Sequence, residues 1–171
     1  MISEMSTKMK PSNNYARWIF SVFTSGGICL ALISTFIAQY KGVVAIFGVA
    51  LLVSAIAVFS KYIASVYYYD IIVDYNGTPI FVVRQITGKR ESTLCRIDIA
   101  DIVCVKHESS KERRKHKTPA GYVKYNYSPT LAPKRTSRLT VEGKYEKAEI
   151  IIENELYAEH LARISQELKS I

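Results

Sequence analysis

The sequence predicts an α+β membrane protein, in which an N-terminal hairpin of two transmembrane helices is followed by a β-rich soluble domain. Three observations predict this class. Two long segments without charge follow each other near the N-terminus. Beyond them, short segments rich in β-branched residues alternate between apolar and polar positions and are separated by turn residues. Helical periodicity returns only in the last part of the chain, from Glu155 onward.

The first uncharged segment consists of the 23 residues between Arg17 and Lys41. As a helix it would extend about 34 Å, which exceeds the roughly 30 Å thickness of a bilayer's hydrocarbon core. The segment is longer than the apolar region of a signal peptide, and a second apolar segment follows it after a single charge. The pattern therefore predicts a transmembrane helix over about residues 18–40.

The second uncharged segment lies between Lys41 and Lys61, and Tyr62 extends it, so that a second transmembrane helix is expected over about residues 42–62. The connection between the two helices is so short that they must be antiparallel neighbours. Together they define a transmembrane domain over residues 17–63. A soluble pair of core helices would carry a polar stripe, and neither segment has one.

Small residues recur four positions apart on both predicted helices. This spacing lets helix backbones approach closely, within the hairpin or between copies in a homo-oligomer, although small residues are also common in membrane helices generally. The positions concerned are Ser21 and Ser25, with Gly26 and Gly27 beside them, and Ala50 and Ser54 on the second helix.

The distribution of cations predicts the orientation of the hairpin. Lys8, Lys10 and Arg17 precede the first helix, Lys61 follows the second, and Lys41 alone lies at the tip. Because loops rich in Lys and Arg stay on the cytoplasmic side, both termini are expected in the cytoplasm of a multi-pass cell-membrane protein. Residues 1–16 are polar and aperiodic, and we expect them to form a flexible cytoplasmic tail.

The soluble domain is expected to span residues 65–171 and to contain seven strands followed by one helix. Asn76-Gly77 is a strong hairpin turn signal, and Asn154 is placed to cap a helix that starts at Glu155. Seven strands without intervening helices favour an antiparallel sandwich or barrel, with the intervening residues 108–121 and 128–136 as loops. The expected strands are residues 65–75, 79–87, 92–97, 102–107, 122–127, 137–142 and 147–153.

This order of elements resembles the pleckstrin-homology-like fold, and membrane helices just before the first strand resemble bacterial membrane proteins that carry such a domain. The resemblance covers about residues 65–170 and implies a seven-stranded antiparallel barrel or sandwich closed by a C-terminal helix. The first hairpin loop, Asn76-Gly77-Thr78, is not basic and the last helix lacks tryptophan, so phosphoinositide binding is not implied. The residues that suggest the resemblance to the pleckstrin-homology-like fold are Tyr67-Tyr68-Tyr69-Asp70-Ile71, Asn76-Gly77, Arg84 and Arg96-Ile97-Asp98-Ile99-Ala100-Asp101-Ile102.

The sequence contains no nucleotide-binding, zinc-protease or serine-hydrolase motif. Its histidines, His107, His116 and His160, are scattered, and its three cysteines show no metal-ligand spacing. Asp98 and Asp101 fit a turn between strands better than a pair of catalytic carboxylates. We therefore expect no catalytic residue, metal or cofactor, and a protein that is not an enzyme.

The conspicuous feature is cationic: residues 111–117 carry five positive charges and one negative charge, and further cations follow. Three partners suit such a surface: the anionic inner leaflet, an acidic protein, or nucleic acid stacked on interleaved tyrosines, of which nucleic acid fits least. A solvated loop that helps to set the membrane topology is the alternative. The candidate residues are Lys111, Arg113, Arg114, Lys115, Lys117, Lys124, Lys134, Arg135 and Arg138.

These observations predict a membrane-anchored binding or scaffold protein that presents a basic domain at the cytoplasmic face of the membrane. The expected partners are anionic membrane lipids and other membrane proteins. The alternative prediction is an accessory subunit of a larger membrane complex for transport or for the cell envelope, because two helices are too few to form a transport pathway alone.

Overall fold

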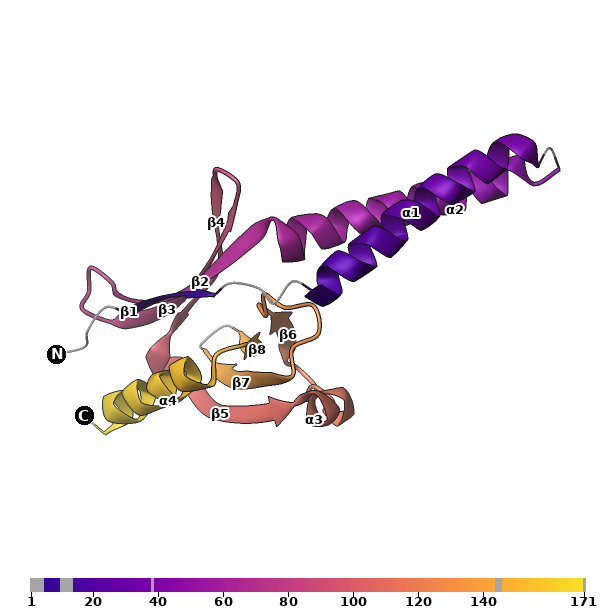
Figure 1. Ribbon diagram of the computed structural model, residues 1–171. Coiled ribbons are helices and arrows are strands. Elements are labelled where there is room, and N and C mark those ends of the chain that lie inside the picture. Colours follow the sequence, from indigo (N-terminus) through magenta and orange to yellow (C-terminus); the bar gives the residue numbers. More distant parts are fainter. Residues whose placement is uncertain (1–4, 10–13, 38, 144–145, 171) are drawn as a thin grey trace. The chain divides into compact units, whose positions relative to one another are not determined.

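Figure 1 shows the computed structural model of the chain, which describes residues 5–9, 14–37, 39–143 and 146–170. The chain forms two compact units. One unit is Pro11–Ser65 and contains the two long helices. The other combines Met1–Lys10 with Val66–Ile171 and contains two four-stranded sheets and a C-terminal helix. The predicted α+β class is therefore confirmed.

The helical unit contains α1 (Asn14–Phe36) and α2 (Lys41–Val58), and a π-helical turn, η1 (Phe59–Ile63), continues α2. Both helices are long and apolar enough to cross a membrane. Relative to the predicted residues 18–40, α1 begins and ends four residues earlier. A helix can start within the polar flank of its apolar segment, so the absence of charge does not mark helix ends.

The two helices pack closely at Gly27 of α1 and Gly48 of α2. A Cβ atom at Gly27 would lie 2.8 Å from the Leu52 side chain and 3.0 Å from the Gly48 carbonyl oxygen. A Cβ atom at Gly48 would lie 3.2 Å from the Gly27 carbonyl oxygen. Glycine at these two positions therefore allows backbone-to-backbone packing between α1 and α2.

The small-residue pairs predicted to line the contact do not lie in it. Ser21, Ser25, Ala50 and Ser54 are all exposed within the helical unit. The Ser25 hydroxyl donates to Val22 O (3.3 Å) and the Ser54 hydroxyl donates to Ala50 O (2.8 Å), both within their own helix. Gly27, which the prediction named beside Ser21 and Ser25, does lie in the contact. The four-residue spacing itself does not mark the contacting face, because several faces of these helices carry small residues.

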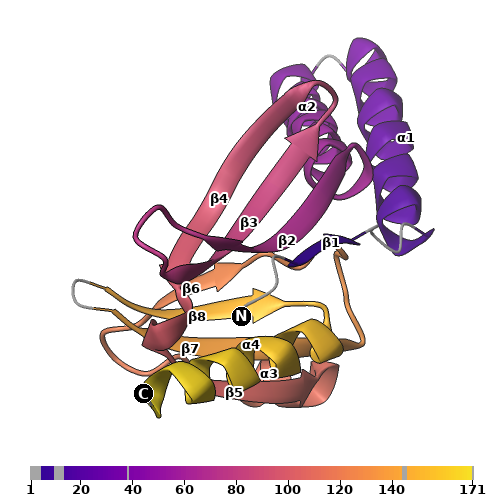
Figure 2. The same ribbon diagram turned by 90° about the vertical axis from the view of Figure 1, so that its left-hand side faces the viewer.

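The first sheet, sheet A, has the strand order β1-β2-β3-β4. Figure 2 shows β2, β3 and β4 side by side, with β3 and β4 forming the long hairpin of the sheet. Its strands are β1 (Met5–Met9), β2 (Ser65–Val73), β3 (Pro79–Thr87) and β4 (Arg90–Asp98).

Strand β1 corrects the prediction of a flexible tail for Met5–Met9, whereas residues 1–4 and 10–13 of that predicted tail lie outside the described residues. It pairs antiparallel with β2, with Met5 opposite Ile71 and Met9 opposite Tyr67. Met9 packs against the apolar core, and the Lys8 ammonium lies 6.0 Å from the centre of the Tyr68 ring. The pairing joins residues about 60 positions apart in the sequence, so the short segment gives no local signal of a strand.

The second sheet, sheet B, has the strand order β5-β7-β8-β6, and a 3₁₀ turn, η2 (Ile99–Asp101), connects it to sheet A. Seven strands were predicted, and β2–β8 correspond to them; the eighth described strand is β1. The sheet is not wholly antiparallel, because β6 pairs parallel to β8. The strands are β5 (Ile102–Ser109), β6 (Val123–Asn126), β7 (Arg135–Glu142) and β8 (Lys147–Ile152).

The core of this unit lies between the sheets and beneath the C-terminal helix α4 (Glu155–Lys169). The rings of Tyr69, Phe81 and Tyr157 meet there with centroids 5.9–6.2 Å apart. Burial raises the pKa of Tyr69, and its hydroxyl donates to the Tyr127 carbonyl (2.9 Å). The Asn154 side chain accepts from the Tyr157 amide (3.1 Å), which confirms the predicted helix cap.

Candidate anion-binding surface

The basic segment 110–117 begins as a short helix, α3 (Ser110–Lys115), and not as the predicted loop. A capping box starts it: the Ser109 hydroxyl accepts from the Glu112 amide (3.4 Å), and the Glu112 carboxylate accepts from the Ser109 amide (2.8 Å). The Ser109 amide and the Ser109 hydroxyl (2.8 Å) both donate to this carboxylate, and these two hydrogen bonds lower the pKa of Glu112. The spacing Ser109-x-x-Glu112 is typical of a capping box and could have predicted this helix, but the many charged residues of the segment led to the prediction of a loop.

We expect Ser109→Ala to accelerate amide hydrogen exchange in Ser110–Lys115 by roughly fivefold, because the substitution removes the helix cap. Glu112 stabilises α3 above the ordinary Glu pKa of about 4.3, and this contribution is lost as the pH falls through its lowered pKa. Exchange corrected for intrinsic rates should therefore accelerate in the wild type below about pH 4. The control is Ser109→Thr, which keeps the hydroxyl. If amide exchange in Ser109→Thr were as fast as in Ser109→Ala, the role of the cap would be refuted.

Beneath this segment, three buried charged side chains cross the outer face of sheet B. Arg138 of β7 donates to Glu108 of β5 (2.6 Å) and to Glu149 of β8 (2.9 Å). All three side chains are 3% exposed. They point away from the apolar core because Arg138 and Glu149 alternate with Leu139 and Ile150, which belong to that core.

Two side chains after α3 dock the basic segment onto this network. His116 Nε2 lies 2.8 Å from one Glu149 oxygen, and the Thr118 hydroxyl donates to the other oxygen (2.9 Å). The Ser110 amide donates to the Lys134 carbonyl (3.1 Å) and fixes the other end of the segment. The segment therefore has a defined position on sheet B, although all of its cations except the half-buried Arg113 are exposed.

The structure removes two predicted residues, Arg138 and Arg135, from the surface. Arg138 is buried between two carboxylates and cannot reach an external anion. Arg135 is exposed, and it lies 3.6 Å from Glu155. The prediction treated every cation after residue 110 alike. In the structure, alternation along β7 places Arg138 on the outer face of sheet B, beneath the basic segment 110–117.

The other predicted cations lie on or beside the docked segment. Lys124 of β6 is in register with Glu149, so its side chain lies on the same face of sheet B. Lys106, which the prediction missed, is in register with Arg138 and helps to lower the pKa of Glu112. We call the whole group the α3 basic surface: Lys106, Lys111, Arg113, Arg114, Lys115, Lys117, Lys124 and Lys134.

The carboxylates closest to this surface already have partners. Glu108 and Glu149 bind Arg138 inside the sheet, and Glu112 binds Ser109 at the helix cap. Within the described residues, no member of the α3 basic surface forms an ion pair. The surface is therefore strongly positive.

The tyrosines in and beside strand β6 bind other residues of the same domain. Tyr125 and Tyr127 stack on each other with their planes 3° apart, and their hydroxyls donate to Glu146 (2.7 Å) and to Leu94 O (3.1 Å). The Tyr122 hydroxyl donates to Glu142. This arrangement gives no support to the alternative in which these rings stack on nucleic-acid bases.

A serine, a histidine and a glutamate meet elsewhere on sheet B. His107 Nδ1 lies 2.9 Å from the Ser137 hydroxyl, and His107 Nε2 lies 3.7 Å from Glu159 of α4. The order resembles a nucleophile, a base and an orienting acid, but Ser137 is wholly buried (0% exposed) and no substrate can reach its hydroxyl. The three residues connect β5, β7 and α4.

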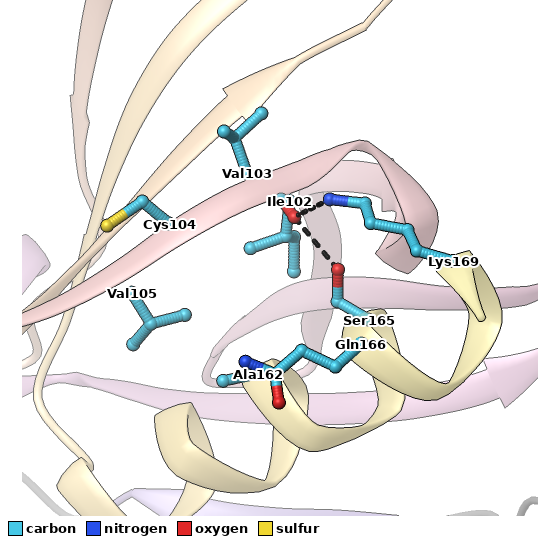
Figure 3. Close-up of a pocket in the computed structure, with 8 residues that line it drawn as sticks. All are labelled: Ile102, Val103, Cys104, Val105, Ala162, Ser165, Gln166 and Lys169. Atoms are coloured by element: carbon cyan, nitrogen blue, oxygen red, sulfur yellow. Dashed lines mark hydrogen bonds between the residues drawn. The ribbon is translucent and has the colours of Figure 1, made fainter.

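A groove of about 290 Å³ lies between β5 and α4 (Figure 3). Two of its polar side chains are bonded to the backbone of β5: the Ile102 carbonyl accepts from the Ser165 hydroxyl (2.8 Å) and from the Lys169 ammonium (2.6 Å). Lys169 is therefore fixed to the domain. This pattern is typical of helix packing against a strand, and it offers no convergent free polar groups.

The described residues contain no group of three or more His, Cys, Asp or Glu side chains that could hold a metal ion. No model of a known protein family matches the chain, and a search of curated proteins found no relative. The pleckstrin-homology-like resemblance therefore stays a prediction, and the geometry of the α3 basic surface carries the functional argument.

Proposed function

We propose that this chain is a membrane-anchored, non-enzymatic binding protein whose α3 basic surface contacts anionic lipid headgroups. One observation carries the proposal: the cations of this surface form no ion pair with the described residues, while Glu108, Glu149 and Glu112 bind Arg138 and the α3 cap. A scaffold of this kind would present its sheets at the membrane surface.

The pairing of β1 with β2 supports the membrane topology. Strand β1 precedes α1 in the chain and β2 follows η1, yet the two strands are hydrogen-bonded neighbours in sheet A. If α1 and α2 both cross the bilayer, the chain enters and leaves on the same side. The cations that flank the pair, Lys8 and Lys61 among them, favour the cytoplasmic side.

Anionic lipid is the partner that this arrangement favours. Each cation near an anionic leaflet contributes about 1 kcal/mol within a Debye length. The covalent connection to the membrane helices keeps the domain close to that leaflet. The docking of His116 and Thr118 onto Glu149 orders the segment in advance, which lowers the conformational cost of binding.

The full chain reconstituted in nanodiscs tests this proposal. We expect acylation of Lys111, Lys115 and Lys117 by an amine-reactive ester, read by mass spectrometry, to be several-fold slower in discs that contain phosphatidylglycerol than in phosphatidylcholine discs. Raising the salt to about 1 M shortens the Debye length to about 3 Å and should abolish the difference. Equal rates in both kinds of disc would refute lipid binding by this surface.

Two triple variants of equal charge separate the surface from net charge. Replacing Arg114, Lys115 and Lys117 with glutamine should remove the lipid-dependent protection of Lys111. Replacing Arg135, Lys147 and Arg163 with glutamine removes the same charge elsewhere and should leave that protection intact. Equal loss in both variants would show that total charge, and not the α3 basic surface, causes the effect.

A further inference from the structure

The hairpin between β3 and β4 carries a second, smaller cationic group. Its strands pair as far as Thr87 opposite Arg90, and Gly88 at φ +61° forms the turn. Lys89 and Arg90 are exposed, and neither forms an ion pair within the described part of the chain. Glu91, the nearest carboxylate in sequence, binds Arg84 (2.7 Å), so it does not neutralise the tip.

The direction of the strands fixes which end of sheet A holds this tip. The Asp74 amide donates to the Thr78 carbonyl (2.9 Å) at the turn between β2 and β3. From there β3 runs back along β2, because Arg84 binds Asp70 and lies 5.8 Å from the centre of the Tyr68 ring. The tip therefore lies at the end of sheet A where β2 begins.

That end of sheet A is also where the chain passes to and from the helices. β2 begins at Ser65, two residues after η1 ends at Ile63. On the neighbouring strand, Met9 is the last residue of β1 and lies opposite Tyr67. Both connections to the helical unit leave sheet A at the end that carries Lys89 and Arg90, and this follows from strand order alone.

We infer that the β3–β4 tip is a second lipid contact, in which Lys89 and Arg90 bind anionic headgroups at the surface that α2 enters. The inference rests on the membrane crossing of the helices but not on lipid binding by the α3 basic surface. The tip is short, turns at Gly88, and carries two cations that form no ion pair with the described residues. The long side chains of Lys89 and Arg90 can extend their charges toward the phosphate groups of lipid headgroups.

The experiment uses the full chain in nanodiscs, with acylation of Lys89 read separately from that of the α3 segment. We expect Lys89 to react about fivefold more slowly in discs that contain phosphatidylglycerol, the factor that corresponds to the attraction of one cation to an anionic leaflet. Arg90→Gln should reduce this protection at Lys89. Arg163→Gln, which removes one charge from α4, should not.

Equal reaction of Lys89 in neutral and anionic discs would overturn the inference, even if the α3 segment is protected. Protection of Lys89 in neutral discs by added inorganic phosphate alone would also overturn it, because a soluble anion would then replace the lipid surface. Protection of Lys89 without protection of the α3 segment would support the tip and refute the proposal for the α3 basic surface.

Discussion

Replacing Arg138 with methionine is expected to lower the free energy of unfolding of the sheet unit by about 3–5 kcal/mol. The substitution leaves Glu108 and Glu149 buried without their shared counter-charge, and removing one partner of a buried ion pair incurs the full cost of an uncompensated charge. Pulse proteolysis of the full chain in detergent across a urea series measures this difference.

The matched control is Arg135→Met on the same strand. The Arg135 side chain is 76% exposed and 3.6 Å from its partner Glu155, and exposed pairs of this kind contribute about 0–1 kcal/mol. An equal loss of stability in both variants would contradict the role assigned to the buried network.

A triple variant tests whether the buried ion pairs themselves stabilise the fold, or whether stability is lost only when one charged partner is removed and the others stay buried. Converting Glu108 and Glu149 to leucine together with Arg138→Met should recover most of the lost stability, because apolar replacement of a whole buried network is often neutral. The same variant removes the acceptor of His116 and Thr118. Amide exchange in the α3 segment should therefore stay fast even where global stability returns.

The second large effect is expected at Gly27, where alanine should lower the stability of the helical hairpin by about 1–3 kcal/mol. The added methyl group would meet the Gly48 carbonyl oxygen at 3.0 Å and the Leu52 side chain at 2.8 Å. A backbone atom on the opposite helix can only yield if the helices move apart. Titration with a denaturing detergent, followed by the helical circular dichroism signal, measures the loss.

The adjacent Gly26 provides the control for this prediction. A methyl group there would lie 3.5 Å from Leu51, which is an ordinary van der Waals contact. Gly26→Ala should therefore be neutral or stabilising by up to about 1 kcal/mol, because alanine favours the helix. If Gly26→Ala and Gly27→Ala have effects of the same sign and size, the close approach at Gly27 does not hold the hairpin together.

Local patterns predicted the elements of the β-rich domain well and their partners poorly. Alternation and turn residues gave β2–β8, and Asn154 gave the start of α4. Strand β1 and the parallel pairing of β6 depend on partners far away in the sequence, and nothing in either segment indicates which partner it will have. Period-two alternation predicts on which face of the sheet a side chain lies, but it does not predict which other segment packs over that face.

The candidate site shows the same division. Sequence identified the cationic segment because charge is a local property of composition. It could not separate Arg138 from the exposed cations, since the burial of Arg138 depends on Glu108, Glu149 and the covering loop meeting in space. It likewise gave His116 no role, because the partner Glu149 lies 33 positions further along the chain.

The position of β1 ahead of the helices constrains how the protein can be made. On the ribosome, β1 is synthesised first, but its partner β2 emerges only after α1 and α2 have been completed. Sheet A therefore cannot close until both helices have been translated, and β1 cannot pair with β2 before then. If the helices cross a membrane as proposed, a chain in which only one of them inserted would leave β1 and β2 on opposite sides, and sheet A could not be completed.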